Sequence, residues 1–388
     1  MEMKARLLHI IYNKIYQRTN HFVRTKSMTK PQITIETLGH KTGAGVRNFM
    51  RLMNKFRRWG WNVALNKGYD HAEFVIIHFR PIPNYEEYFD KIKSAKKNGS
   101  KILLYLIEPL DLRTETWTDN LAPIHIVLET LDLCDAIIVN SIGYLYSSQY
   151  IELNAFSAYL SKTVLIEESL LEELYGNLPI KQHKTQTPVA VWHGYTTNLS
   201  RWVKGDWPGN LNLDPKQYPS VYEKNESEKY GNLYNVLDIP LITIAKYHPE
   251  IKVDKIYPGE RSIGKMLQDF DIGIAPFYTN IYRTLNKPFG AKIQTYMIVG
   301  LPVIASPIPD YKRWIEHEKT GLFADSAKEW KDASKQLKDP KLRQKIADNA
   351  RSMVLINFSP DRIIGKFESL LYSLMKKEEN LPFLITNY

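Results

Sequence analysis

The sequence predicts an α/β protein made of two doubly wound domains, and three observations point to this fold class. The chain has 388 residues, and single hydrophobic cores stop growing at roughly 250–300 residues, so two domains are expected. Short apolar runs alternate with helical patterns, which is typical of parallel sheets covered on both faces. The alternation occurs twice, on either side of the polar stretch Lys181–Gln186. We therefore expect four segments, a basic N-terminal segment, two domains and a C-terminal helix with a tail, at residues 1–30, 31–185, 186–358 and 359–388.

The first domain begins with a predicted strand, a glycine loop and a helix. Ile33–Leu38 is rich in strand-forming residues, Gly43 and Gly45 mark the loop, and apolar residues at helical spacing follow until Gly60. A glycine loop between a parallel strand and a helix N-terminus is the usual place for a phosphate or another anion. We therefore expect Gly43 and Gly45 to contact a ligand, with a plain turn as the alternative.

Five more strands and two helices complete the predicted first domain. The strands are Trp61–Leu65, Glu73–Phe79, Lys101–Ile107, Ala136–Asn140 and Thr163–Ile166, and the helices are Tyr85–Lys97 and Ile124–Leu133. In such a parallel sheet the carboxyl ends of the strands gather at one edge, where open α/β sheets bind their ligands.

The second domain repeats the alternation. Its strands are Val189–Trp192, Leu241–Tyr247, Ile272–Pro276 and Pro302–Ser306. The segment between the first two of these strands is rich in Asn, Tyr, Trp, Gly and Pro and is either a lid or an insertion. Three helix starts are well marked, because Ser326 and Glu329 form a capping box and Asp339 and Ser359 each precede a first-turn proline.

Composition and charge restrict the class of protein. The single cysteine, Cys134, excludes an intramolecular disulfide and a thiolate-rich metal site, and it fits a reducing cytoplasm. No apolar run approaches the ~18 residues of a membrane-spanning helix. The net charge of +10 and the pI near 9.2 favour anionic partners such as nucleotide diphosphates, phospholipid headgroups or nucleic acid. Nucleic acid has the least support, since the sequence carries no zinc-finger, RNA-recognition or helix-turn-helix signature.

The block 271–351 carries the most chemical information. A strand opens into a loop that holds Arg283, Lys287 and Lys292 close to the start of the next helix. Cations and free backbone N–H groups then converge there, as a diphosphate site requires, although solvated surface lysines would give the same pattern. Gly300 ends this helix and a buried strand returns, so we expect the helix N-terminus at the carboxyl edge of the sheet.

A specific motif follows this loop. Lys292–Ser306 reads K-x-x-x-Y-M-x-x-G-L-P-V-I-A-S, preceded by DIGIAPF and followed by TGLF and DPxLR. This run resembles the donor-binding domain of family 4 (group 1) glycosyltransferases and their relatives with the GT-B fold. The resemblance implies two Rossmann-like domains that face a cleft, with a nucleotide sugar held mainly by the second domain.

Two positions depart from the family pattern. Family members carry a glutamate five residues before the glycine of G-L-P-V, where it accepts hydrogen bonds from the ribose, and this chain has Thr295 there with Gln294 beside it. The earlier glutamate of the family's pair falls at Lys287. The resemblance thus makes Gln294 or Thr295 the replacement for the ribose ligand. The missing carboxylates keep a second function open, a GT-B scaffold that binds a nucleotide sugar or a glycan without turnover.

In the resembling families a histidine or carboxylate of the first domain faces the sugar. The candidates near the carboxyl ends of predicted strands are His78, Glu108 and His40. A histidine at a strand end is as often structural, so that alternative stays open for His78. His193 follows the first strand of the second domain, and we expect it to contact the donor.

The predicted function is transfer of a sugar from a nucleotide-sugar donor to a hydroxyl of a glycan or lipid-linked glycan, without a metal or another cofactor. The triplet Asp269-Phe270-Asp271 is the one match to a metal-binding Asp-x-Asp. It precedes a strand, at the amino edge of the sheet, and we interpret it as a solvated turn. A nicotinamide oxidoreductase would need a third glycine at Asn48.

Residues 1–30 combine seven basic residues and a single acid with apolar residues at helical spacing, Leu8, Ile11 and Ile15. This pattern suits an amphipathic helix on an anionic membrane surface, so we expect a cytoplasmic protein with a peripheral membrane contact. Packing of the same helix on the first domain, or a disordered basic arm, are the alternatives.

Overall fold

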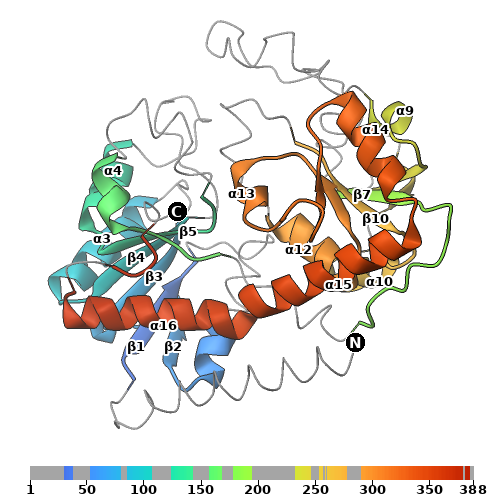
Figure 1. Cartoon of the computed structure of the whole chain (residues 1–388). Coiled ribbons are helices and arrows are strands. Elements are labelled where there is room, and N and C mark those ends of the chain that lie inside the picture. The colour runs from blue at the N-terminus through green and yellow to red at the C-terminus, as the bar shows by residue number, and fades with distance from the viewer. Residues whose placement is uncertain are drawn as a thin grey trace, which may run out of the picture. The chain divides into compact units, whose positions relative to one another are not determined.

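The computed structural model contains two six-stranded parallel sheets, and the chain divides into two compact units built mainly on these sheets (Figure 1). The structure describes residues 30–37, 53–79, 85–106, 124–142, 157–167, 178–194, 232–245, 253–256, 258, 260–277, 290–378 and 381–384. None of the described helices is long and apolar enough to cross a membrane.

The first sheet has the strand order β2-β1-β3-β4-β5-β6. Its strands are β1 (Gln32–Glu36), β2 (Asn62–Leu65), β3 (Phe74–Phe79), β4 (Lys101–Leu106), β5 (Ala136–Val139) and β6 (Thr163–Leu165). Its helices are α3 (Tyr85–Lys97) and α4 (Ile124–Leu133), which pack against each other, with short 3-10 turns η1 (Tyr69–His71) and η2 (Ser157–Lys162). Successive residues along β3 and β4 are buried, as expected of parallel strands covered on both faces.

The second sheet has the strand order β12-β11-β10-β7-β8-β9, and all its strands are parallel. The strands are β7 (Ala190–Gly194), β8 (Leu241–Ala245), β9 (Lys255–Ile256), β10 (Ile272–Ala275), β11 (Val303–Ala305) and β12 (Leu322–Phe323). The helices are α9 (Leu233–Val236), α10 (Glu260–Leu267), α12 (Gly290–Val299), α13 (Pro309–Lys312), α14 (Ala327–Gln336) and α15 (Pro340–Asn357). Helix α16 (Pro360–Lys376) follows α15, and its buried side chains are not part of the core around this sheet. Helix α12 packs between α10 and α15, so its middle is buried in the core of this unit.

The structure contains the predicted elements wherever it describes them, and it adds two short edge strands that were not predicted, β9 and β12. The predicted strands and helices are all present, with ends that differ by no more than two residues. Of the helix expected after Gly45, residues 53–58 are described and helical, and Gly60 ends it with a left-handed φ of +83°. The capping box of Ser326 and Glu329 is formed, and Asp339 caps α15. The four-segment division of the chain stays a prediction.

Position 300, which follows the last residue of α12, requires glycine for two separate reasons. Its φ of +86° lies in the left-handed region that side chains disfavour. A Cβ atom at this position would also lie 2.7 Å from Cγ1 of Ile180 and 2.8 Å from the backbone nitrogen of Lys181. Glycine is therefore required both by the turn and by the segment that packs against it.

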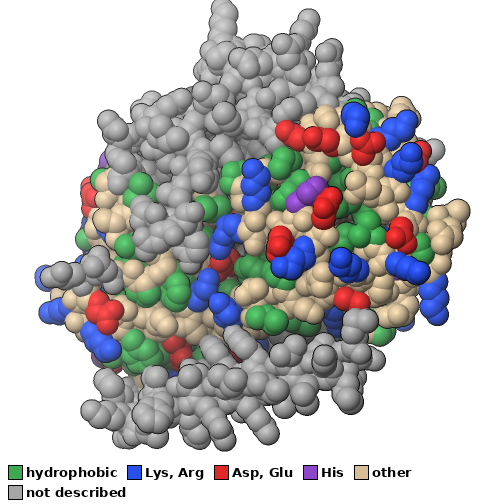
Figure 2. All heavy atoms as spheres, in the orientation of Figure 1, with side chains coloured by type: hydrophobic (Ala, Val, Ile, Leu, Met, Phe, Trp, Pro, Cys, Tyr) green, Lys and Arg blue, Asp and Glu red, His purple; other side chains and the backbone are tan. Residues whose placement is uncertain are grey.

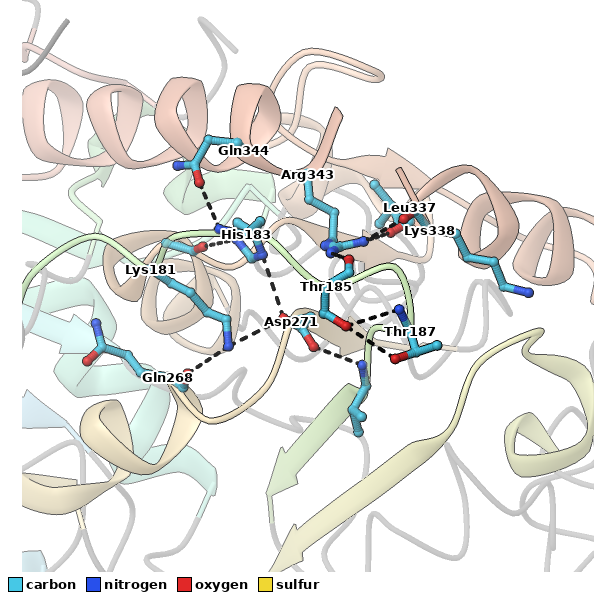
Figure 3. A network of polar contacts seen from close by, with 12 residues as sticks. Lys181, His183, Thr185, Thr187, Gln268, Asp271, Leu337, Lys338, Arg343 and Gln344 are labelled. Carbon is cyan, nitrogen blue, oxygen red and sulfur yellow. Dashed lines mark hydrogen bonds and ion pairs between the residues drawn. The ribbon is translucent and has the colours of Figure 1, made fainter. Parts of the chain in front are cut away.

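That segment, the extended stretch before β7, is fixed to the second unit by polar contacts (Figure 3). The imidazole Nε2 of His183 lies 2.8 Å from the carbonyl oxygen of Gly300, and the His183 backbone N–H donates to Gln344. The buried guanidinium of Arg343 donates to the carbonyl oxygens of Lys338 and Thr185. The polar composition that marked Lys181–Gln186 as a separator thus serves specific hydrogen bonds.

The interpretation of Asp269-Phe270-Asp271 as a solvated turn is right for Asp269, which is exposed, and wrong for Asp271. Asp271 is only 7% exposed, accepts a hydrogen bond from the Val189 N–H, and lies 3.4 Å from the ammonium of Lys181 (Figure 3). Although burial raises the pKa of Asp271, the neighbouring His183, the Val189 N–H and Lys181 together lower it to about 2. Its carboxylate anchors the segment before β7.

The described surface mixes charges of both signs on the face drawn in Figure 2, where Lys and Arg side chains lie among Asp and Glu. Among the described residues, ion pairs at the surface join Lys328 to Asp332 on α14 and Lys338 to Asp238. Exposed pairs of this kind contribute little to stability.

Candidate functional site

The candidate site lies where β7 and β10 separate at their carboxyl ends. Strand β7 pairs with β8 along five residues up to Gly194, but it pairs with β10 only at Ala190 and Val191. From β7 the chain adds strands first on the β8 side and then on the β10 side, so this gap is the topological switch point of the sheet. Open α/β sheets bind their ligands at such points.

Lys292 stands on the first turn of α12 beside this gap. Its ammonium lies 4.4 Å from the centre of the ring of Trp192, the middle residue of β7. Within the described part of the chain, no carboxylate pairs with Lys292, and burial lowers its pKa to about 7. A cation held in a poorly solvated place without a counter-ion is suited to bind an anionic group.

His193 adds a neutral ring to the same place. Burial and the nearby charge of Lys292 lower the pKa of His193 to about 3, so the imidazole is uncharged near neutral pH. Its Nε2 atom is buried and has no hydrogen-bond partner among the described residues. The ring is therefore available as a hydrogen-bond donor or acceptor for a ligand.

Two glycines keep the surroundings of Lys292 and the start of α12 tightly packed. A Cβ atom on Gly194 would lie 2.8 Å from the Trp192 ring and 3.4 Å from the Lys292 ammonium, and one on Gly290 would lie 2.7 Å from the indole of Trp314. The indole nitrogens of Trp192 and Trp314 are both buried and have no hydrogen-bond partner in the described part of the molecule. The Trp314 ring nitrogen thus lies beside the start of α12, whose own backbone N–H groups favour anions.

Gln294 and Thr295 follow Lys292 on α12, and both are nearly buried, with 4% and 7% of their surface exposed. Both therefore belong to the buried part of α12, a helix that packs against α10 and α15. The ribose contact proposed for these two residues stays a prediction.

His78, the first catalytic candidate, lies within β3 of the first sheet, and its ring centre is 6.4 Å from that of Tyr105. It is buried, with 5% of its surface exposed. Its role as a base stays a prediction. The remaining candidates fall outside the described residues, and their roles also stay predictions: His40, Gly43, Gly45, Glu108, Arg283 and Lys287.

Comparison with protein families supports the expected resemblance. Residues 244–353 match the family described as Glycosyl transferases group 1. A Xenopus tropicalis protein described as glycosyltransferase 1 domain-containing protein 1 is 28% identical over 164 residues, which is 42% of this chain. The match covers 47% of that relative, so the chain spans about half the length of the curated protein it resembles. The predicted resemblance to group 1 glycosyltransferases is therefore confirmed.

Solved structures confirm the predicted fold class. A glycosyltransferase from Rickettsia africae is similar over 90% of this chain and 100% of its own, with a TM-score of 0.57 at 12% identity. HepE from Anabaena, in complex with UDP and glucose, is similar over 88% of this chain and 100% of its own, with a TM-score of 0.52 at 12% identity. The two parallel α/β sheets and these neighbours agree with two Rossmann-like domains of the GT-B kind.

Proposed function

Because residues 244–353 carry a group 1 glycosyltransferase domain, we propose that this chain transfers a sugar from a nucleotide-sugar donor to a hydroxyl group of an acceptor. The acceptor is a glycan or a lipid-linked glycan, as the family resemblance implies. The second unit, which holds most of the matched residues, binds the donor.

The observation that carries this proposal is the uncompensated cation at the start of α12. Lys292 has no carboxylate partner in the described part of the chain, and the neutral His193 ring lies beside it. A nucleoside diphosphate supplies the missing negative charge and acceptors for the buried N–H groups of Trp192 and Trp314. This arrangement is therefore suited to the diphosphate of the donor.

In the proposed reaction, an oxygen of the acceptor hydroxyl forms a bond to the anomeric carbon of the sugar. The bond between that carbon and the diphosphate oxygen breaks, and the nucleoside diphosphate leaves with the bonding electrons. Negative charge grows on the leaving oxygen, and Lys292 with the N–H groups at the α12 N-terminus stabilises it. The hydroxyl proton passes to a base of the first domain, for which His78 is the described candidate.

These groups also support the proposal that no metal or other cofactor is needed. A metal ion in such reactions neutralises the charge of the leaving diphosphate. Lys292, Arg283, Lys287 and the helix N-terminus supply positive charge in the predicted loop and the described site.

The second candidate function is binding of a nucleotide sugar or glycan without turnover. It is favoured by Thr295 and Lys287, which stand where family members carry glutamates. The two functions share the donor site and differ only in whether the sugar is transferred.

One experiment separates the possibilities. The full-length protein is incubated with UDP-sugars and GDP-sugars and a mixture of glycan acceptors, with and without EDTA, while the melting temperature and the release of free nucleotide are measured. Nucleotide release that continues in EDTA supports metal-independent transfer. A raised melting temperature without release supports binding alone, because a ligand stabilises the folded state by mass action. If none of these nucleotide sugars raises the melting temperature or is consumed, transfer from them and binding of them are both wrong, and only glycan binding is left of the second function.

A further inference from the structure

The hydroxyl group of Tyr296 lies between the two strands that separate at the candidate site. Tyr296 projects from α12, and its oxygen is 3.1 Å from the backbone nitrogen of His193, which donates to it. The same hydroxyl lies 3.2 Å from the carbonyl oxygen of Val191 on β7 and 3.3 Å from that of Ile274 on β10, so it donates to one of these two carbonyls. One phenol therefore meets main-chain groups of both strands.

These contacts occur where the sheet ladder between the strands has stopped. The last register pair of β7 and β10 is Val191 with Gly273, and His193 lies two residues beyond it. Neighbouring strands lie about 4.8 Å apart when they are hydrogen-bonded directly. The phenol supplies the partners that a continued ladder would have supplied, and it keeps the strands apart.

Gly273 provides the space that the phenol ring needs. A Cβ atom at this position would lie 2.4 Å from Cγ and 2.6 Å from Cδ2 of Tyr296. The ring is fully buried, and burial raises the pKa of Tyr296, so the hydroxyl keeps its proton. The imidazole of His193 packs edge-on against the same ring, with 5.0 Å between the ring centres.

We propose that Tyr296 is a positioning residue of the donor site, which holds β7 and β10 apart and, by fixing the main chain of His193, holds the imidazole ring of His193 toward the ligand. This inference rests on the proposed function, since it assumes that His193 contacts the nucleotide. Tyr296 itself does not touch the ligand. Its effect on binding passes through His193.

Tyr296→Phe tests the proposal, because it keeps the ring and removes only the hydroxyl. Tyr311→Phe is the matched control, since Tyr311 is also fully buried in the same unit and its hydroxyl has no hydrogen-bond partner among the described residues. Isothermal titration with UDP is expected to give on the order of tenfold weaker binding for Tyr296→Phe, the effect of one lost hydrogen bond. Tyr311→Phe is expected to bind UDP as the wild type does.

A double-mutant cycle distinguishes positioning from a general loss of structure. In the His193→Ala background, Tyr296→Phe is expected to change UDP affinity by less than about twofold, because the imidazole ring through which Tyr296 acts is absent. An equal loss of affinity in both backgrounds overturns the proposal, as does unchanged UDP affinity in Tyr296→Phe. Failure of the wild type itself to bind UDP or any other nucleotide would instead contradict the proposed function.

Amide hydrogen exchange of the wild type covers the case in which Tyr296→Phe does not fold. The His193 amide has its hydrogen bond to Tyr296, so it is expected to exchange as slowly as the paired amides of β7. Exchange as fast as that of an unprotected loop amide would overturn the proposal.

Discussion

The pH dependence of nucleotide binding should report directly on Lys292. Burial lowers the pKa of this ammonium to about 7 in the free protein, against an ordinary value of 10.5. A bound diphosphate favours the charged form, so binding above pH 7 requires the lysine to take up a proton. About half of the side chain is charged at pH 7 and about one part in a hundred at pH 9. The apparent affinity is therefore expected to fall roughly fiftyfold between these pH values, or about 2.3 kcal/mol.

Isothermal titration of UDP from pH 7 to pH 9 measures this effect. The window lies above the second phosphate pKa of about 6, so the charge of the diphosphate changes little across it. Titration in two buffers with different ionisation enthalpies also gives the proton uptake on binding, which should approach one proton per site near pH 8 to 9.

Lys292→Met provides the comparison, because it keeps an unbranched side chain over the Trp192 ring without the charge. It should weaken UDP binding at pH 7 by about 1.5–3 kcal/mol, the usual contribution of a charge-assisted hydrogen bond, and it should remove the pH dependence. Lys328→Met is the matched control, since Lys328 is exposed on α14 and pairs with Asp332. A wild-type affinity that is constant from pH 7 to pH 9, or a pH dependence that persists in Lys292→Met, would refute the reasoning.

Three other predictions concern the ribose position, the anchor of the segment before β7, and the N-terminus. Thr295→Glu should change UDP affinity and lower the melting temperature, because a carboxylate would enter a position that is 7% exposed; an unchanged affinity in titration would mean that position 295 does not contact the nucleotide. Asp271→Asn should lower the melting temperature, because it leaves the Lys181 ammonium without its partner, whereas Asp269→Asn at the exposed neighbour should not. The pKa of Asp271 is held at about 2, against 3.8 ordinarily. Its contribution to wild-type stability is therefore present above about pH 4 and is lost as the pH falls toward 2. Thermal denaturation of the wild type across this pH range measures the loss. Full-length protein should co-sediment with anionic vesicles at low salt more than a protein that begins at Lys30, and equal, low sedimentation of the two would remove the membrane contact expected of residues 1–30.

The fold could be predicted where local signals are strong. Helix α3 begins and ends at the predicted residues, because Glu86 and Glu87 lie in its first turn, Lys96 and Lys97 in its last, and Gly99 follows with a left-handed φ of +94°. Strands such as β3 are short apolar runs bounded by polar residues, and their burial on both faces follows from that composition. Such signals lie within one element and need no knowledge of distant contacts.

Contacts between distant segments account for what the sequence did not reveal. Asp271 was taken for a surface residue because its partner Lys181 is far away in the chain, and nothing in the pattern links the two. The burial of Thr295 likewise depends on the folded structure, in which α12 packs against helices from before and after it in the chain. Charge and spacing in the sequence identified Lys292 and His193, and the structure places both beside Trp192 and Gly194. The role proposed for Tyr296 could not be predicted, because it depends on the separation of β7 and β10, which the pattern of apolar residues does not indicate.

The glycine of the G-L-P-V motif has a consequence for how such motifs are interpreted. Gly300 follows the last residue of α12, whereas Lys292 stands on its first turn, and the neighbours of Gly300 in space are Ile180 and Lys181, from the segment before β7. This glycine can therefore be retained in evolution because the segment before β7 packs against it, independently of any substrate. A match to a family motif then measures inherited packing as well as inherited chemistry. Two proteins can share this glycine and still differ in the sugar they handle, or in whether they handle one at all.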